Sequence, residues 1–225
     1  MTMTATPLDY RQRVGSGVMR GHDARAGRDF RRRRALAAAT EVFAARGYHA
    51  ATMDQIAQHA GYSKPMLYEH FSTKLDLYLA VLCGPIDILV ESVRRALSSP
   101  VSNRERVHGA GKAYFDFVDQ DIQRFRLVFD SDATSEPSVQ WRVGRGTDAC
   151  VEAVAQLVAD ESALGAQRAR VLAAGLVGAS RLAAQYWLET GRVIPKPDAV
   201  EAVVTLCWGG LSRVPLDRSP RVTAT

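Results

Sequence analysis

A cation, a phenol and an imidazole stand close together in the segment 64–70. Lys64, Tyr68 and His70 carry these groups. An ammonium, a phenol and an imidazole can each donate a hydrogen bond to a phosphate oxygen or to the edge of a base. Side chains of these types at this spacing are candidates for contact with a nucleic acid, provided that one exposed face presents them together.

Helix signals on both sides of Gly61 supply such a face. Thr52, with Gln55 three positions later, is typical of a capping box at a helix N-terminus. Gly61 predicts the end of that helix, because a chain reversal there favours a left-handed residue. Ser63 is placed to cap a second helix, and Pro65 suits its first turn. This pattern predicts a helix-turn-helix, whose second helix can enter the major groove of DNA.

Two short helices can also form an ordinary helical hairpin, and the pattern alone leaves this alternative open. For a helix-turn-helix, we predict that Lys64 contacts base edges while Pro65 and Met66 touch a thymine methyl group. Phosphate contacts are predicted for five side chains around the two helices: Thr52, Tyr68, His70, Lys74 and Arg33. Lys74 belongs to this group because it stands at the predicted N-terminus of the next helix, where a phosphate is attracted.

Positive charge is concentrated at the N-terminus. The whole chain of 225 residues has a net charge of +5, and residues 1–34 hold nine arginines against three aspartates. Residues 1–27 lack apolar periodicity, so we predict a disordered basic arm. Its proximal arginines, from Arg25 to Arg34, can lie along phosphates or in the adjacent minor groove. A solubilising tail is the alternative.

The composition is that of a globular domain with a sizeable core. Hydrophobic residues make up 47% of the chain and charged residues 24%. No apolar run approaches the roughly 20 residues of a membrane span, and no secretory signal is recognisable. Cys83, Cys150 and Cys207 are far apart, which favours reduced thiols and a cytoplasmic location. We expect no membrane association, no bound metal and no cofactor.

One motif suggests a nucleotide site. Gly144, Gly146 and Ala149 have the spacing of a dinucleotide-binding fingerprint. That fold needs parallel strands alternating with helices, and no second strand candidate exists in the sequence. We therefore interpret the segment as a helix with two glycines near its start. Without a nucleophile elbow or a metal-binding spacing of histidines, we predict that the protein is not an enzyme.

The apolar spacing predicts an all-α protein of about nine helices. A helix over 29–46, ended by Gly47, precedes the helix-turn-helix, and Thr73 with Asp76 opens a long helix to about residue 97. Pro85 lies inside that helix, and we expect a kink or break near 81–84. The expected domains are a helix-turn-helix domain at 28–80, a helical ligand-binding and dimerisation domain at 81–215, and a loose tail at 216–225.

Two later segments, 165–190 and 198–211, are too apolar for helices that face water. We predict that they dimerise with a second copy, and burial within one protomer is the alternative. The predicted interface consists of small and apolar residues from both segments: Leu172, Leu176, Ala179, Ala183, Val203 and Cys207.

Three groups of residues between Arg33 and Leu82 keep a characteristic order and spacing: Ala38, Phe43, Gly47 and Tyr48; Thr52, Ile56, Ala57, Ala60 and Gly61; then Ser63, Lys64, Leu67, Tyr68, His70, Phe71 and Lys74. On these residues the chain resembles the TetR family of bacterial transcription regulators. The resemblance implies a DNA-binding domain followed by a domain that encloses a ligand cavity. The segments 75–82, 114–117, 175–178, 186–188 and 208–212 resemble members of this family that control fatty-acid synthesis.

The resemblance further implies an apolar tunnel that takes a long-chain acyl-CoA. The tunnel is then expected to be lined by residues of the central helices: Leu89, Val93, Leu97, Tyr114, Phe117, Phe125, Phe129, Trp141, Cys150 and Val154. On this basis we expect a homodimer that binds double-stranded operator DNA and controls lipid-biosynthesis genes.

Two alternatives stay open. The first is a TetR-type repressor of an efflux or detoxification gene that senses another hydrophobic small molecule. The second is a helical lipid carrier or enzyme whose helix-turn-helix is vestigial.

Overall fold

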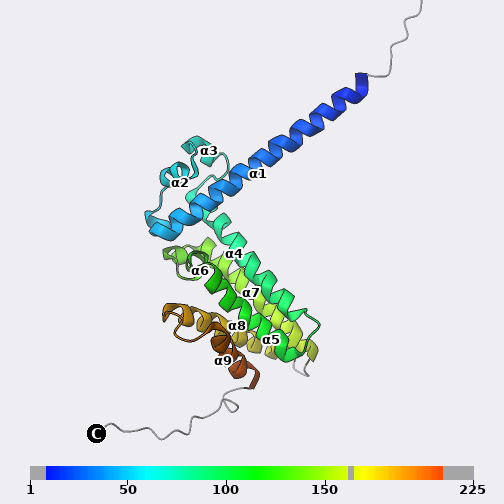
Figure 1. Ribbon diagram of the computed structural model, residues 1–225, viewed down its shortest axis with the longest axis vertical. Coiled ribbons are helices and arrows are strands. Elements are labelled where there is room, and N and C mark those ends of the chain that lie inside the picture. Colours follow the sequence, from blue (N-terminus) through cyan, green and yellow to red (C-terminus); the bar gives the residue numbers. More distant parts are fainter. Residues whose placement is uncertain (1–8, 162–164, 210–225) are drawn as a thin grey trace, which may run out of the picture. The chain divides into compact units, whose positions relative to one another are not determined.

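The computed structural model describes the backbone of residues 9–161 and 165–209, and side chains from residue 25 onwards. All its regular elements are helical, which confirms the prediction of an all-α protein (Figure 1). The chain forms two compact units, Met1–Val81 and Leu82–Thr225. Within the described residues, no helix is long and apolar enough to cross a membrane. The predicted tail at 216–225 lies outside the described residues.

The first unit contains α1 (Asp9–Ala50), α2 (Met53–Ala60), α3 (Lys64–Tyr68) and the start of α4 (Lys74–Leu97). Gly47 interrupts α1 with φ 77° and ψ 170°, as its position in the sequence predicts. The prediction of a disordered arm over 1–27 is wrong from Asp9 onwards, because α1 begins there. That segment contains no proline, which would break a helix, and its four arginines favour a helix, whereas its four glycines do not. Residues 1–8 lie outside the described part.

Capping hydrogen bonds stabilise the N-termini of α2 and α4 in the first unit. Thr52 Oγ1 accepts from the Gln55 amide at 3.3 Å, and the Gln55 side chain accepts from the Thr52 amide at 3.1 Å, which confirms the capping box. Gly61 is left-handed, with φ 69°. The Asp76 amide donates to Thr73 Oγ1 at 3.0 Å. Ser63 occupies the N-cap position of α3 but makes no side-chain capping bond, so the expected cap is wrong in that respect.

The core of the first unit joins α1 to the short helices. Ala35, Ala39 and Phe43 of α1 are almost completely buried, as are Ile56 of α2 and Leu67 of α3. The ring of Phe43 lies edge-on to that of Tyr78, with centroids 5.0 Å apart. This packing turns the opposite side of α3 outward.

The second unit is a bundle of helices. After α4 follow α5 (Asn103–Gln120), α6 (Ile122–Phe129), the short 3-10 helix η1 (Asp132–Ser135), α7 (Pro137–Glu161), α8 (Ala166–Glu189) and α9 (Lys196–Gly209). In Figure 1, α4, α5 and α7 run alongside one another. Contacts agree with this view, because Arg142 of α7 binds Asp87 of α4 at 2.7 Å and Gly109 of α5 lies against Ala96 of α4.

The expected break in α4 is absent, whereas the interpretation of the segment around Gly144 and Gly146 as part of a helix is confirmed. The helix α4 is not broken near 81–84, since it continues without interruption through the buried Pro85. Gly144 and Gly146 lie inside α7, which begins at Pro137, so no strand-to-helix turn precedes a nucleotide-binding glycine loop. Gly146 instead brings α7 close to α4, because a Cβ added there would lie 2.4 Å from Ile86 Cγ2.

Candidate functional site

The outward side of α3 presents the residues that are predicted to contact bases. Lys64 and Pro65 are exposed, and Met66 is half-buried, while Leu67 is completely buried and fixes the orientation of the helix. The three candidates stand in the first turn of α3, the part of a recognition helix that contacts base edges in helix-turn-helix proteins. Tyr68 follows them and is 42% exposed.

Lys64 is held by an acidic residue of α2. Its Nζ lies 2.9 Å from Asp54 Oδ1, and the hydrogen bond with Asp54 raises the pKa of Lys64. Both side chains are exposed, and exposed ion pairs contribute about 1 kcal/mol or less. The ion pair can therefore break at little cost in free energy when a base or a phosphate binds the ammonium.

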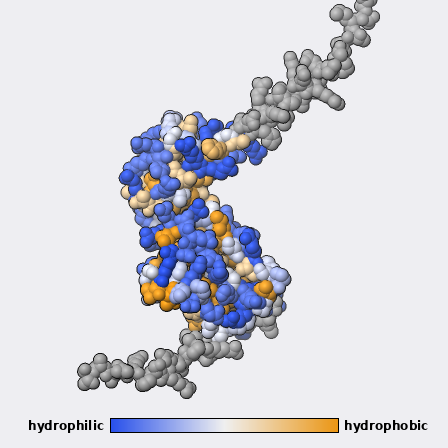
Figure 2. Space-filling view, in the orientation of Figure 1, coloured by the Kyte–Doolittle hydropathy of each residue, from blue (hydrophilic) through white to orange (hydrophobic). Residues whose placement is uncertain are grey.

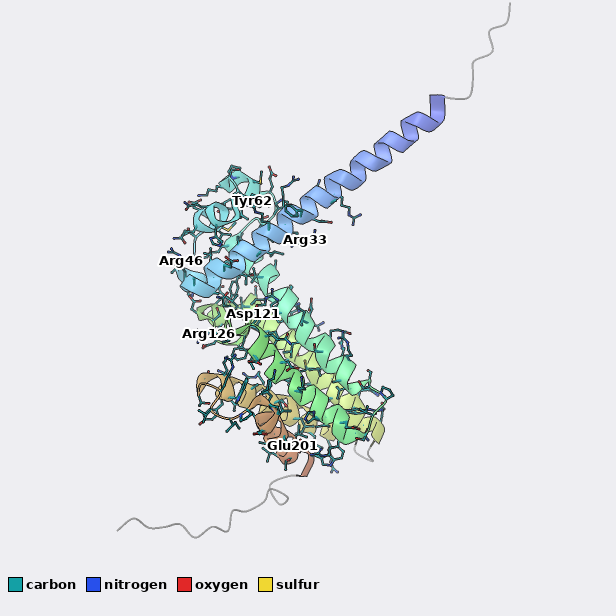
Figure 3. The ribbon with its side chains drawn as sticks, in the orientation of Figure 1. Arg33, Arg46, Tyr62, Asp121, Arg126 and Glu201 are labelled. Atoms are coloured by element: carbon teal, nitrogen blue, oxygen red, sulfur yellow. The ribbon has the colours of Figure 1, made fainter. Side chains whose placement is uncertain are left out.

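Three of the five predicted phosphate contacts are accessible and chemically suited to that role. Thr52 is exposed, and its hydroxyl hydrogen can still donate, because in the capping box its oxygen acts as an acceptor. Arg33 is exposed on α1 and forms no ion pair with another described residue (Figure 3). Tyr68, also exposed, keeps its place in the predicted set.

The structure contradicts a phosphate contact for Lys74, and it buries one ring nitrogen of His70. The ammonium of Lys74 donates to three backbone carbonyl oxygens, those of Tyr48 at 2.8 Å, Ala51 at 3.1 Å and His49 at 3.2 Å. An ammonium has three N–H donors, so none is left for a phosphate. His70 turns its Nε2 inward, where this atom is buried without a hydrogen-bond partner among the described residues.

Arginines of α1 border the α2–α3 turn. The guanidinium of Arg32 lies 4.5 Å from the centre of the Phe71 ring, and that of Arg34 lies 5.6 Å from the Tyr62 ring. Tyr62, labelled in Figure 3, donates from its hydroxyl to the Arg31 carbonyl at 3.3 Å. These contacts fix part of the basic segment beside the reading helix, so cationic and base-reading groups belong to one compact unit.

The interior of the second unit contains two small cavities with Tyr114 in the wall of both. One, of about 30 Å³, is lined mainly by apolar residues of α4, α5, α7, α8 and α9: Val93, Leu97, Val107, Ala110, Gly111, Tyr114, Val154, Leu176, Val177, Ser180, Val203, Val204 and Cys207. The other, of about 10 Å³, is lined by Ile86, Leu89, Val90, Tyr114, Val128, Phe129, Val143, Gly146, Thr147, Cys150 and Arg181. Each holds no more than one or two waters.

Tyr114 is a neutral phenol between these cavities. Burial raises the pKa of its hydroxyl, which also interacts with the Cys150 thiol through a hydrogen bond. Burial raises the pKa of Cys150 as well. The pair therefore places two uncharged polar groups, one from α5 and one from α7, at the point where the cavities approach each other.

Seven of the ten predicted tunnel residues line these two cavities: Leu89, Val93, Leu97, Tyr114, Phe129, Cys150 and Val154. Phe117 and Phe125 line neither, and instead pack with Phe129 in an aromatic cluster beside them. Trp141 is a wrong prediction, since 66% of the residue is exposed and Arg145 lies over its ring. An apolar residue type does not by itself say which side of α7 faces inward.

The outer face of α8 and α9 is apolar but differs from the predicted set. Leu172 is 50% exposed, and Ala179 and Ala183 are half-buried. Val203 is nearly inaccessible, and it lines the larger cavity together with the half-buried Leu176 and Cys207. The large apolar side chains that α8 and α9 expose are Val171, Leu172, Leu182, Tyr186, Leu206 and Trp208. Hydrophobic patches of this kind interrupt the hydrophilic surface of the second unit in Figure 2.

Comparison with known proteins identifies both units. The family of bacterial regulatory proteins of the tetR type matches residues 35–81, and the tetracyclin repressor-like C-terminal domain matches residues 92–222. The transcriptional activator FasR from Mycolicibacterium smegmatis is 51% identical over 208 residues, which cover 92% of this chain and 94% of FasR. The chain belongs to the TetR family. It is a helix-turn-helix transcription regulator closely related to FasR.

Solved structures agree with this assignment. A TetR-like regulator from Rhodococcus sp. RHA1 superposes with a TM-score of 0.66 at 28% identity, covering 81% of this chain and 96% of that one. FadR from Bacillus subtilis, solved in complex with stearoyl-CoA, reaches a TM-score of 0.69 at 15% identity over 79% of this chain and 98% of FadR. The likeness to FadR shows the fold alone.

Arg181 of this TetR-family regulator is absent from the sites predicted from the sequence. It lines the smaller cavity and is half-buried on α8. A signal was present, because Arg181 is the only charged residue in the apolar stretch 171–188. The exposed apolar residues of α8 were harder to find, since a helix that is apolar all round gives no period from which to choose its outer face.

Proposed function

We propose that this TetR-family regulator binds operator DNA as a homodimer and is controlled by a long-chain acyl-CoA held between the helices of its second unit. Its targets would be genes of fatty-acid or lipid biosynthesis. The observation that carries the proposal is the 51% identity to FasR across almost the whole chain. The apolar cavities on either side of Tyr114 support it, because they give a hydrocarbon chain a path through the bundle.

The effector must open this path. Cavities of about 30 and 10 Å³ are too small for an acyl chain, so its entry requires the Tyr114 ring to move and its contact with Cys150 to break. A ligand that binds only after this rearrangement of α5 against α7 binds one conformation of the bundle more tightly than the other. Regulation by a ligand requires such a difference in affinity.

Thermal denaturation with added ligands tests the effector. Palmitoyl-CoA and stearoyl-CoA are expected to raise the melting temperature, since a ligand that binds only the folded state adds stability with its concentration. Free CoA and hydrophobic dyes are expected to have no such effect. Stabilisation by dyes but not by acyl-CoA would instead support a repressor of an efflux gene, and no sequence preference in a gel shift with its own upstream DNA would exclude a DNA-reading role.

Substitution of Lys64 by alanine is expected to relax operator specificity. If the ammonium binds a guanine edge, its loss costs roughly 1–3 kcal/mol of discrimination against the wrong base. Competition binding with single-base operator variants measures this discrimination. Asp54→Asn is the matched control, because it frees the same ammonium from its ion pair and leaves the charge of Lys64 in place. Unchanged discrimination in Lys64→Ala would remove Lys64 from base recognition.

A charge on the apolar face of α8 is expected to prevent dimerisation. Leu182 is 61% exposed on that face, and burying a glutamate there between two copies leaves an unpaired charge. Leu182→Glu should therefore sediment as a monomer and lose operator affinity. Ile88→Glu on α4 is the control, because it makes the same change at a residue that is 53% exposed outside α8 and α9. A dimeric Leu182→Glu variant would exclude this face as the interface.

A further inference from the structure

Arg181 is a half-buried cation on α8. Its guanidinium lies 5.7 Å from the centre of the Phe129 ring, and it forms no ion pair with any other described residue. A charge withdrawn from water is costly unless it is paired. An arginine held in this way among apolar residues is suited to an oxygen ligand that comes from outside the protein.

The position of Arg181 connects the interior with the surface. Besides the smaller cavity, it lines an open groove of about 420 Å³ formed by α6, η1, α7 and α8. Groove and cavity share four further residues: Val128, Phe129, Val143 and Thr147. The guanidinium therefore lies at the boundary between solvent and the apolar interior.

The order of lining residues along the helices gives the path a direction. On α7, Val139 lines the groove, Cys150 lines the smaller cavity, and Val154 lines the larger cavity. On α4, the smaller cavity is lined by Ile86, Leu89 and Val90, and the larger one by Val93 and Leu97. Groove, smaller cavity and larger cavity thus follow one another along the bundle.

The groove has few groups for a phosphate. Its polar residues other than Arg181 are neutral or acidic, namely Thr134, Gln140, Thr147 and Asp148. Amide and hydroxyl groups suit the pantetheine arm of CoA, whose phosphates lie far from the acyl carbonyl. Arg181 is consequently the one cation of the groove and cavity linings, and it lies where the polar end of a chain would meet the apolar path.

We infer that Arg181 binds the oxygen end of the acyl effector and thereby fixes the direction in which the chain enters. The bound oxygen is the thioester carbonyl of an acyl-CoA or the carboxylate of a free fatty acid. The hydrocarbon tail then passes Tyr114 and ends near Val93 and Leu97. This inference rests on the proposed function, since it assumes that an acyl chain is the effector.

Ligand pairs that differ only at the oxygen test the inference. Isothermal titration compares palmitoyl-CoA with S-hexadecyl-CoA, a thioether that keeps the chain and the CoA but lacks the carbonyl oxygen, and includes palmitate as a third ligand. The wild-type protein is expected to bind palmitoyl-CoA roughly tenfold more tightly than the thioether, as for one hydrogen bond to a charged group. In Arg181→Met this difference should vanish, and palmitate affinity should fall by at least as much. Arg181→Lys should retain part of the preference.

Control variants separate this role from a structural one. Arg145→Met removes an exposed arginine of α7 and should leave all three affinities unchanged. If Arg181→Met binds palmitoyl-CoA as tightly as the wild type does, the inference is overturned while the proposed effector stands. If the wild type binds palmitate through Arg181 but no acyl-CoA, the proposed effector is wrong, and the role of Arg181 in binding the oxygen end of the chain stands. If it binds neither, both are overturned.

Discussion

Lys74→Ala is expected to lower the melting temperature of the first unit by roughly 10–20 °C without removing a phosphate contact. The Lys74 ammonium donates to three carbonyl oxygens at and just after the end of α1, those of Tyr48, His49 and Ala51. It also lies 4.5 Å from the centre of the Tyr48 ring. A hydrogen bond from a charged donor contributes about 1.5–3 kcal/mol, and carbonyls left without a donor add their own cost.

The half-buried position of Lys74 reduces this loss, because water can reach part of the site. A net destabilisation of about 2–3 kcal/mol is expected, and in a unit of this size each kcal/mol corresponds to roughly 4–8 °C. Thermal denaturation followed by circular dichroism measures it. Lys64→Ala is a suitable comparison, because it removes a lysine from an exposed ion pair that contributes about 1 kcal/mol or less.

The salt dependence of DNA binding by Lys74→Ala distinguishes a structural role of Lys74 from binding to a phosphate. A lysine that neutralises a phosphate contributes about 0.9 to the slope of log affinity against log salt. We expect the slope to stay unchanged in Lys74→Ala under conditions where the variant is folded. An unchanged melting temperature together with a smaller slope would show that Lys74 binds DNA and that the carbonyl contacts are dispensable.

The first unit was largely predictable because its signals are local. The capping box of Thr52 and Gln55 and the turn at Gly61 depend on residues a few positions apart. Lys74 was misassigned because its partners lie 23 to 26 positions earlier in the chain, and their carbonyls leave no trace in the sequence pattern. The helix N-terminus suggested a phosphate, whereas tertiary contacts of the ammonium decided its role.

In the second unit, the spacing of apolar residues predicts the buried side of some helices but not of others. The residues Leu89, Val93 and Leu97 recur at helical spacing on α4, and all three are buried, as the pattern indicates. On α8 nearly every position is apolar, so the pattern could not separate Leu176, which lines a cavity, from Leu182, which is exposed. Which side of such a helix faces the interior is set by its neighbours in three dimensions.

Gly146→Ala is expected to destabilise the second unit, whereas Gly144→Ala two residues earlier should stabilise it. Alanine is favoured over glycine in a helix by about 1 kcal/mol at either position. At Gly144 nothing lies within 4 Å of an added Cβ, so this gain is realised. At Gly146 the Cβ would lie 2.4 Å from Ile86 Cγ2, and relieving such overpacking costs about 1–3 kcal/mol.

Ile86 cannot move aside easily, because it is buried on α4 and a β-branched side chain has one strongly preferred rotamer in a helix. Ile86→Leu removes the Cγ2 methyl and keeps the side-chain volume, at a cost below about 1.5 kcal/mol. The double variant should therefore regain most of the stability that Gly146→Ala loses. Urea denaturation of the four proteins gives the coupling energy directly.

A coupling of roughly 1–2 kcal/mol would show that Gly146 is required for the close approach of α7 to α4. This outcome would also explain the G-x-G spacing of Gly144 and Gly146 without a nucleotide, because one glycine serves helix packing and the other lies where a Cβ has room. Equal effects of the two alanine substitutions, with no coupling to Ile86, would contradict this packing role.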